Sequence, residues 1–342
     1  MQNRSRAALA AALVSGLALS ACSAAGGSSD SDANTLSVVG YSVLEAANKP
    51  VFEDFEGTDA GKDVTFKTSY GASGDQSRAV EGGLDADVVH FSLEPDIQRL
   101  VDAGLVDEGW KDNTDTQGIV TSSVVSFVVR EGNPKDIQGW DDLVKPGVEI
   151  ITPNPASSGS AKWNILGAWG HAIQAGGSEK DATEFVEKFL GNTISLPSSG
   201  REATTAFSEG NGDVLISYEN EAILARANGE AFDYIVPDDT LLIENPAAVT
   251  TDSSDTAQAF LDFQLTPDAQ ADYATFGFRP VVDGVTLPEV EGANDPSDPF
   301  PTPGTLLTID DDFGGWGEAN SKFFDENDGI ITRLQEETGT LG

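Results

Sequence analysis

The sequence of 342 residues is poor in the side chains that carry out catalysis or bind metals. It has one cysteine, Cys22, and two histidines, His90 and His171. A single cysteine leaves no internal disulfide, and its place near the N-terminus argues against a thiol nucleophile. The Gly-x-Ser-x-Gly elbow, the Gly-x-x-x-x-Gly-Lys phosphate loop and the His-Glu-x-x-His zinc motif are also missing. We therefore expect a protein that binds rather than reacts, with no cofactor, no metal and both histidines in packing roles.

Positive charge is scarce as well. Lys and Arg number 19 against 57 Asp and Glu, which gives a formal net charge of −38. So acidic a surface repels nucleic acid and excludes it as a partner. It does not exclude a small anion, because surface charges act over about 8 Å at physiological ionic strength while a pocket's dipoles act at contact distance. The acidic clusters at 310–312 and 325–328 lack the spacing of a calcium loop, so we expect solvated faces there.

The apolar run from Ala7 to Leu19 is too short to span a membrane as a helix. It follows Arg4 and Arg6 and has the form of an export signal, which predicts a signal peptide over residues 1–21. Its end, Leu-Ser-Ala-Cys22, resembles the lipobox of bacterial lipoproteins and implies a lipid on Cys22. Residues 22–35 then hold the lipidated cysteine and a flexible tether. We expect an exported protein, anchored by lipid on the outer side of the cytoplasmic membrane.

What the chain does have is a repeated junction of strand, Gly/Ser loop and helix. In residues 148–164 a β-rich run meets two prolines, and Ser158, Gly159 and Ser160 then stand at the entrance of a helix. The first turn of a helix has N–H groups without partners and carries partial positive charge, so it can hold an oxyanion without a cationic side chain. Ser and Gly at such a place also serve simply as an N-cap and a turn residue. One copy of the junction therefore does not decide between these roles.

Two further copies of the junction favour the oxyanion site over the simple N-cap. The second runs from residue 64 to residue 84 and the third from residue 193 to residue 207. Alternating strands and helices predict an α/β fold with mainly parallel sheets, and such sheets place ligands beyond the carboxyl ends of their strands. Three loops of this kind can direct donors at one point. In the second copy, a helix is expected that carries Gln76, Ala79, Val80 and Leu84 on one side.

The segment 152–164, Thr-Pro-Asn-Pro-x-Ser-Ser-Gly-x-Ala-Lys-Trp-Asn, resembles the most recognisable motif of the sulfate-binding proteins that serve ABC-type sulfate and thiosulfate importers. Other stretches agree in order and spacing, so that the likeness spans nearly all of the chain after the signal. They are Gly71-x-Ser-Gly-x-Gln76, Ala86-Asp-Val-Val89, Arg130-x-Gly-Asn-Pro134, Trp140-x-Asp-Leu143, Gly212-Asp-Val-Leu215, Glu219-Asn-Glu-Ala222, Arg279-Pro280 and Phe313-Gly-Gly-Trp316.

This resemblance implies an α/β, two-lobed periplasmic-binding-protein-like fold of type II, with mainly parallel sheets and a ligand cleft between the lobes. The apolar runs 122–130 and 246–250 fall where that family's lobes are cross-connected. We accordingly expect one lobe from residues 36–120 plus 247–285 and the other from 121–246 plus 286–342. It further implies a monomer that presents its ligand to a membrane permease and is not an enzyme.

In that family, sulfate is held without its water by backbone N–H groups, one serine hydroxyl and one indole N–H. Carried over by resemblance, the hydroxyl falls on Ser158. Tyr218 stands where the family has its tryptophan; a phenol can also donate, although a strand tyrosine commonly only packs half-buried. Ser42 replaces an aspartate, and Arg201 and Lys162 are expected to pair with surface acids, Arg201 in a supporting role near the site. The backbone donors fall on Ser73, Gly159, Ser160 and Gly200.

The preferred oxyanion stays open at this point. Within the motif, Ala156 and Lys162 replace a lysine and an arginine of the family. Sulfate and thiosulfate are favoured, with molybdate as a close alternative. Phosphate ranks lower because it carries a proton at neutral pH and needs an acceptor that the three loops do not offer. A surface enzyme acting on sulfate or phosphate esters is the alternative from another class.

Overall fold

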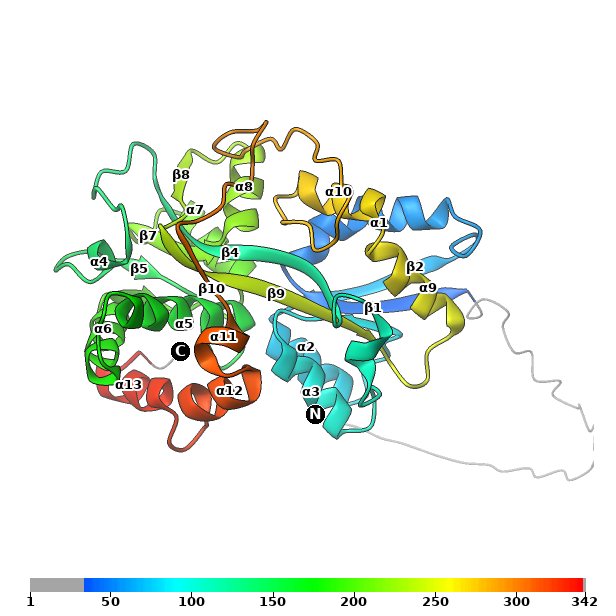
Figure 1. Ribbon diagram of the computed structural model, residues 1–342, viewed down its shortest axis with the longest axis horizontal. Helices are drawn as coiled ribbons and strands as arrows, with labels where there is room; N and C mark the ends of the chain where they lie inside the picture. The colour runs from blue at the N-terminus through cyan, green and yellow to red at the C-terminus, as the bar shows by residue number, and fades with distance from the viewer. Residues whose placement is uncertain (1–33, 341–342) are drawn as a thin grey trace, which may run out of the picture. The chain divides into compact units, whose positions relative to one another are not determined.

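The computed structural model describes residues 34–340, which form one compact unit. Within them a sheet of strand order β2-β1-β3-β9-β4-β7-β5-β6 runs through the unit with helices on both faces, while β10 pairs with β9 and β8 with β4 (Figure 1). The strands are β1 (Thr35–Tyr41), β2 (Thr65–Gly71), β3 (Val88–His90), β4 (Ile119–Arg130), β5 (Ile150–Ile151), β6 (Thr193–Ser195), β7 (Val214–Tyr218), β8 (Phe232–Ile235), β9 (Asp239–Val249) and β10 (Thr305–Leu307).

Strands and helices alternate up to β7, as the sequence predicted, except that both α5 and α6 stand between β5 and β6. A single 3-10 turn, η1 (Trp110–Asn113), precedes β4. The α-helices are α1 (Leu44–Glu56), α2 (Ser73–Glu81), α3 (Glu94–Asp102), α4 (Trp140–Leu143), α5 (Gly159–Gln174), α6 (Glu179–Gly191), α7 (Gly200–Ser208), α8 (Glu219–Ala227), α9 (Asp255–Gln264), α10 (Pro267–Thr275), α11 (Ile309–Phe313), α12 (Trp316–Phe324) and α13 (Ile330–Thr338).

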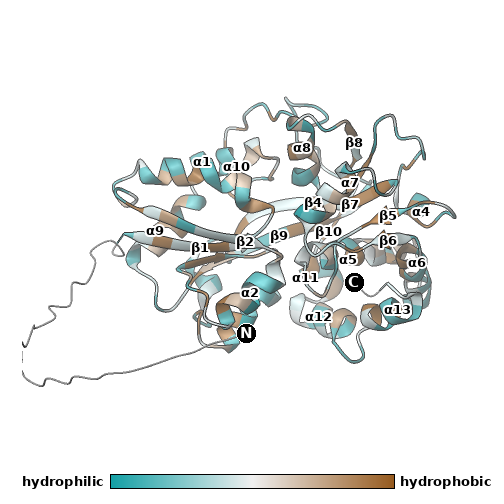
Figure 2. Cartoon of the chain, turned by 180° about the vertical axis from the view of Figure 1, so that it is seen from behind, coloured by the Kyte–Doolittle hydropathy of each residue, from teal (hydrophilic) through white to brown (hydrophobic). Residues whose placement is uncertain are grey.

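Two lobes stand on either side of the sheet's centre, which confirms the predicted fold class. We call first lobe the parallel group β2-β1-β3 with α1–α3, α9 and α10, and second lobe the group β7-β5-β6 with β8, α4–α8 and α11–α13. The buried strands β3, β5 and β7 consist largely of apolar residues. In Figure 2 the outer faces of the helices are mostly teal. The residue limits of the lobes given above stay a prediction.

Two long antiparallel strands, β4 and β9, connect the lobes (Figure 1). The first part of β4 pairs with β9 and its last part pairs with β7 and β8 of the second lobe. The end of β9 pairs with β3 of the first lobe. Each strand therefore belongs to both lobes, at the two apolar runs that the sequence pointed to.

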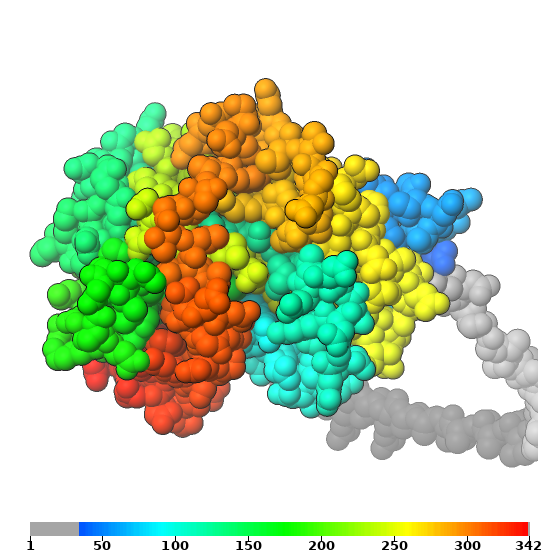
Figure 3. Space-filling view, in the orientation of Figure 1, coloured from blue at the N-terminus to red at the C-terminus, as the bar shows by residue number. Residues whose placement is uncertain are grey.

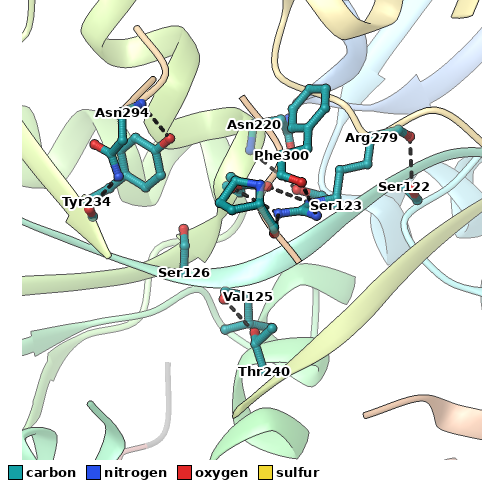
Figure 4. A network of polar contacts seen from close by, with 12 residues as sticks. Ser122, Ser123, Val125, Ser126, Asn220, Tyr234, Thr240, Arg279, Asn294 and Phe300 are labelled. Carbon is teal, nitrogen blue, oxygen red and sulfur yellow. Dashed lines mark hydrogen bonds and ion pairs between the residues drawn. The ribbon is translucent and has the colours of Figure 1, made fainter. Parts of the chain in front are cut away.

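The buried strand β4 carries serine and threonine side chains, and Ser122 and Ser123 are seen in Figure 4 with their partners. Ser126 donates to the carbonyl of Ser217 at 3.5 Å. The hydroxyl of Ser122 donates to the carbonyl of Arg279, and the Ser123 hydroxyl accepts the N–H of Asn220. The Arg279 guanidinium in turn pairs with the fully buried carboxylate of Glu219 at 2.7 Å. These contacts tie the segment around Arg279 and the start of α8 to the crossing strand.

The helix of the second junction is shorter than the sequence predicted, because α2 ends at Glu81 and Leu84 lies beyond it. Gln76, Ala79 and Leu84 are partly or fully exposed, and the residues buried on α2 are Ser73, Gly74, Ser77 and Val80. The helix packs by its N-terminal end, where small side chains allow close approach, and not by an apolar stripe. The hydroxyls of Ser73 and Ser77 both donate to Asp96 of α3, which accounts for their burial.

No helix within residues 34–340 is both long and apolar enough to traverse a bilayer. The predicted signal peptide, Cys22 and nearly all of the tether lie outside the residues that the structure describes.

Candidate functional site

A small pocket of about 10 Å³, enough for one water-sized sphere, lies between the lobes. The register of the parallel strands creates it: Tyr41 is paired with Gly71 and Gly40 with His90, so β1, β2 and β3 end at one edge of the sheet. The edge of the second lobe faces them. The lining residues are Tyr41, Ser42, Val43, Gly71, Ala72, Ser73, Ser92, Ser158, Ser160, Ser199 and Gly200.

Four helices begin at this pocket. The N-cap residues of α1, α2, α5 and α7 are Val43, Ala72, Ser158 and Ser199, and all four line it. The helix starts are in contact, since a Cβ on Gly200 would lie 3.4 Å from Ser160 Oγ and 3.5 Å from Val43 Cγ2. First-turn N–H groups and the positive ends of four helix dipoles thus meet in one small volume. That environment favours an anion.

The hydroxyls around the pocket differ in what they already bond. Ser199 caps α7 by accepting the N–H of Glu202, and the Ser73 hydroxyl donates to Asp96 at 2.6 Å while accepting the N–H of Ser92. Ser73 therefore offers a ligand only its backbone N–H, whereas Ser199 accepts at its cap and keeps its hydroxyl proton. Ser158 is the N-cap of α5 but makes no side-chain cap bond. Its hydroxyl remains available to a guest.

A network of neutral polar groups forms the pocket's floor. The hydroxyls of Ser92 and Tyr218 lie 2.6 Å apart, and Tyr41 donates to the side-chain oxygen of Asn245 at 2.8 Å. Asn245 and Trp163 both donate to the carbonyl of Ser92, which fixes that residue. Burial raises the pKa of Tyr218, against the opposing hydrogen bond with Ser92, so the phenol keeps its proton. The floor can donate hydrogen bonds without carrying charge.

Among the residues that line the pocket there is no Lys, Arg, Asp or Glu. The nearest charged groups lie behind the residues that line the pocket. Arg201 is held by the buried carboxylate of Glu221 at 2.7 Å, and burial raises the pKa of Asp96, which Ser73 separates from the pocket. A guest anion therefore meets dipoles and not ions, the arrangement suited to a ligand that arrives and leaves without proton transfer.

The structure brings together five residues named from the sequence: Ser42, Ser73, Ser158, Ser160 and Gly200 all line the pocket. Gly159 is the first residue of α5 and lines a larger neighbouring cavity. Tyr218 is fully buried beneath the pocket and reaches it through Ser92. Arg201 lies to the side, in its ion pair.

Sequence reasoning missed Ser92, Tyr41, Asn245 and the helix start at Val43. Ser92 follows β3 at the same sheet edge, so a rule applied to every strand end would have found it. The start of α1 has neither a glycine nor a capping side chain, and its N-cap is a valine. Asn245 lies in the middle of β9, and no motif marks it.

The expected pairing of Lys162 with a surface acid is wrong. Its ammonium donates to the amide oxygen of Asn320 at 2.7 Å and lies 5.0 Å from the Phe324 ring. No carboxylate within residues 34–340 lies close enough to form a salt bridge with it. In the same part of the chain, no cluster of three or more His, Cys, Asp or Glu is placed to hold a metal ion.

Comparison with known proteins agrees with this geometry. Residues 36–279 match the model of the bacterial extracellular solute-binding proteins. The chain belongs to this family. It is 42% identical to a sulfate-binding protein of Synechococcus elongatus, over 96% of this chain and 95% of the relative. It is 37% identical to a thiosulfate-binding protein of Escherichia coli, over 82% of this chain and 84% of the relative.

Among solved structures, the solute-binding protein closely resembles the sulfate-binding protein SubI from Mycobacterium tuberculosis H37Rv. The TM-score is 0.79 with 46% sequence identity, covering 85% of this chain and all of that one. The resemblance noted from the motif in residues 152–164 is thereby confirmed, and it extends to the arrangement of most of the described unit.

Proposed function

We propose that this solute-binding protein captures sulfate or thiosulfate outside the cytoplasm and delivers it to an ABC permease, without catalysing a reaction. One observation carries the proposal: four helix N-termini and the free hydroxyl of Ser158 converge on a pocket lined by no charged side chain. The relatives named as sulfate- and thiosulfate-binding proteins support the choice of ligand.

The energetics suit a transport protein. A hydrogen bond to a charged group contributes about 1.5–3 kcal/mol, and micromolar affinity corresponds to roughly 8 kcal/mol. Several backbone donors together with one or two hydroxyls are therefore sufficient after the costs of association and ordering. Closure of the lobes replaces the anion's water by these donors, and their opening releases it.

Phosphate is disfavoured for a chemical reason. At neutral pH it carries a proton that a carboxylate accepts best, and the polar side chains that line the pocket are hydroxyls of Ser and Tyr, with no carboxylate among them. The nearest buried carboxylate, Asp96, already accepts from Ser73. A fully ionised sulfate has no proton to place. Molybdate shares sulfate's shape and charge and stays the closest alternative.

The test is titration calorimetry of the soluble chain, begun at Ser23, against sulfate, thiosulfate, molybdate and phosphate in chloride buffer. We expect sulfate or thiosulfate to bind most tightly, with an affinity that does not change between about pH 6 and pH 8, a range above any proton uptake by sulfate. Tighter binding of phosphate, or heat only with an ester substrate that is turned over, would contradict the proposal.

We further propose that residues 1–21 direct export and that Cys22 carries the lipid that attaches the protein to the outer side of the cytoplasmic membrane. The lipobox-like Leu19-Ser20-Ala21-Cys22 supports this. Mass spectrometry of the N-terminal peptide tests it directly. In addition, Cys22→Ala should prevent lipid attachment, so an unchanged peptide mass in wild type would be the contrary result.

A further inference from the structure

A second, larger cavity of about 580 Å³ lies beside the anion pocket. We call it the outer cavity. One wall comes from α2 and α3 of the first lobe, and the other from the loop 154–158, the start of α5 and the helices α12 and α13 of the second lobe. In Figure 3 the orange-to-red C-terminal residues are seen between the green helices of the second lobe and the cyan helices of the first.

The two cavities are neighbours. Ser158 lines both of them, and Gly74 of the outer cavity is adjacent in sequence to Ser73 of the pocket. Between the cavities, the N–H of Gly74 donates to the carbonyl of Ser157 at 3.0 Å, and Arg78 reaches the carbonyl of Ala156 at 3.4 Å. This partition joins the N-terminus of α2 to the loop before α5. Parting these two contacts would open the pocket to the outer cavity.

Three cationic side chains line the outer cavity: Arg78, Arg99 and Lys162. Lys162 is satisfied only by a neutral amide and an aromatic face. The Nε of Arg99 is buried and makes no hydrogen bond within the described residues, and its Nη1 is 3.8 Å from Glu81. Arg99 is thus held by one long ion pair, and its side chain, which is 37% exposed, can offer guanidinium N–H groups to a ligand oxygen.

Acidic side chains face the same space and oppose an anion there. They are Asp96, Asp325 and Glu326. Asp96 already accepts from Ser73, and Asp325 accepts the N–H groups of Asn327 and Asp328. Those two carboxylates are therefore engaged by donors of their own, whereas Arg99 and Lys162 keep donors available. The outer cavity offers an anion contacts that the acidic remainder of the surface does not.

We propose that the outer cavity is the route by which the oxyanion reaches the pocket, and that Lys162 and Arg99 hold a divalent tetrahedral oxyanion there before the partition at Gly74 and Ser157 parts. This inference rests on the proposed function. It accounts for how a chain of net charge −38 attracts a dianion: repulsion by distant acids is screened beyond about 8 Å, and nearby cations raise the association rate.

The test is stopped-flow fluorescence with sulfate and the soluble chain begun at Ser23. Trp163 is the signal, because it lies in α5, donates to Ser92 and packs edge-on against Trp316 at 4.7 Å. We expect Lys162→Gln and Arg99→Gln each to lower the association rate constant at low salt by about three- to tenfold and to leave the dissociation rate constant unchanged. The difference from wild type should vanish in about 0.5 M KCl.

Three further variants make the outcome decisive. Lys162→Arg keeps the charge and should keep the rate, and Glu326→Gln removes an opposing charge and should raise it. Lys180→Gln is the matched control, since Lys180 is exposed on α6 and paired with Glu184. Equal association rates in all variants, or an effect confined to dissociation, would overturn the route while leaving sulfate binding intact. Wild-type protein that binds no sulfate would instead overturn the proposed function.

Discussion

At the scale of single residues, the pocket is defined by which hydroxyls are already bonded. Ser73 and Ser199 resemble Ser158 in sequence context, since each stands at a glycine-rich helix start. The structure distinguishes the three serines. The hydroxyls of Ser73 and Ser199 have partners in the protein, whereas the Ser158 hydroxyl makes no cap bond. Local sequence predicts that a serine stands at a helix start, but the partner of its hydroxyl comes from a distant segment.

Ser158→Ala should weaken sulfate binding by about 1–3 kcal/mol, because one hydrogen bond to a charged ligand is lost and nothing replaces it. Calorimetry of the two proteins measures the change. Ser253→Ala is the matched control, as its hydroxyl bonds Thr250 in a remote loop and should not affect affinity. Equal dissociation constants for Ser158→Ala and wild type would remove this hydroxyl from the site.

Experiment can decide whether the hydroxyl of Ser92 or that of Tyr218 contributes more to sulfate affinity. Only one proton lies between their hydroxyls, and Ser92 is the member that lines the pocket. If Tyr218 donates to Ser92, the serine proton is free to donate to the anion. Ser92→Ala should then reduce sulfate affinity more than Tyr218→Phe does, in parallel calorimetric titrations. The reverse order would show that the phenol itself contacts the ligand, as the family resemblance implied.

His171 provides a pH-dependent contribution to stability. Burial lowers its pKa, but the hydrogen bonds and charges of Asp239, at 2.7 Å from Nδ1, and of Asp141 raise it by more, so the folded-state pKa lies above the ordinary 6.5. The protonated ring is therefore favoured by folding. Its stabilisation is complete below about pH 6.5 and is lost as pH rises through the folded-state pKa.

Urea unfolding of wild type and His171→Gln at a series of pH values checks this. The difference in unfolding free energy should be largest near about pH 6 and should shrink toward about pH 9, as the wild-type ring loses its proton. Ser253→Ala, which is not near His171, should show a constant difference. A difference for His171→Gln that stays constant with pH would contradict the prediction.

At the scale of elements, three of the four helix starts at the pocket were predictable and one was not. The junctions before α2, α5 and α7 contain Gly and Ser, whereas α1 begins at Val43 and Leu44. What brings α1 there is the pairing of β1 with both β2 and β3, a long-range register that no local pattern encodes. The residues that α2 buries were not predictable for a similar reason, because they contact α3 and the loop of the other lobe.

Substitution of Gly159 tests how closely the start of α5 approaches the first lobe. A Cβ at this position would lie 2.5 Å from Ser92 Oγ and 2.7 Å from Leu93 Cδ2, closer than side chains pack. Gly159→Ala should therefore keep the lobes from closing fully and weaken sulfate affinity at least tenfold, roughly 1.4 kcal/mol or more. Gly191→Ala in α6 is the matched control, since its Cβ meets nothing within 4 Å. Calorimetry compares the two, and equal affinities would contradict close contact at α5.

At the scale of the whole molecule, the fold class and the lobe crossing were predictable from order and composition. Alternating strands and helices gave the α/β architecture, and two apolar runs marked the crossing strands. The polar interior of β4 was not predictable, because its serines are satisfied by Arg279 and Asn220, which are far away in the chain. The lobe limits and the role of Cys22 remain predictions.

At this scale we expect the net charge of −38 to lower the stability of the folded chain. With 57 acidic against 19 basic side chains, the folded chain repels itself, and salt should screen that repulsion. We expect the thermal midpoint, followed by circular dichroism, to rise by several degrees from about 20 mM to about 500 mM KCl. Lys62→Glu, at an exposed position, should show a steeper rise. A midpoint that does not change with chloride salt would show that self-repulsion is unimportant.

The pair of crossing strands limits how the molecule can move. Because β4 and β9 are hydrogen-bonded along residues 119–124 and 242–246, sliding one past the other would break every rung of that ladder, whereas twisting or bending breaks none. Separation of the lobes is thereby restricted to a rotation about this ribbon. Groups on the axis, such as Asn245 and Thr121, barely shift, while the outer lip at Gly74 and Ser157 travels farthest. We therefore expect the lobes to separate by a hinge rotation that leaves the pocket floor in place for the next anion.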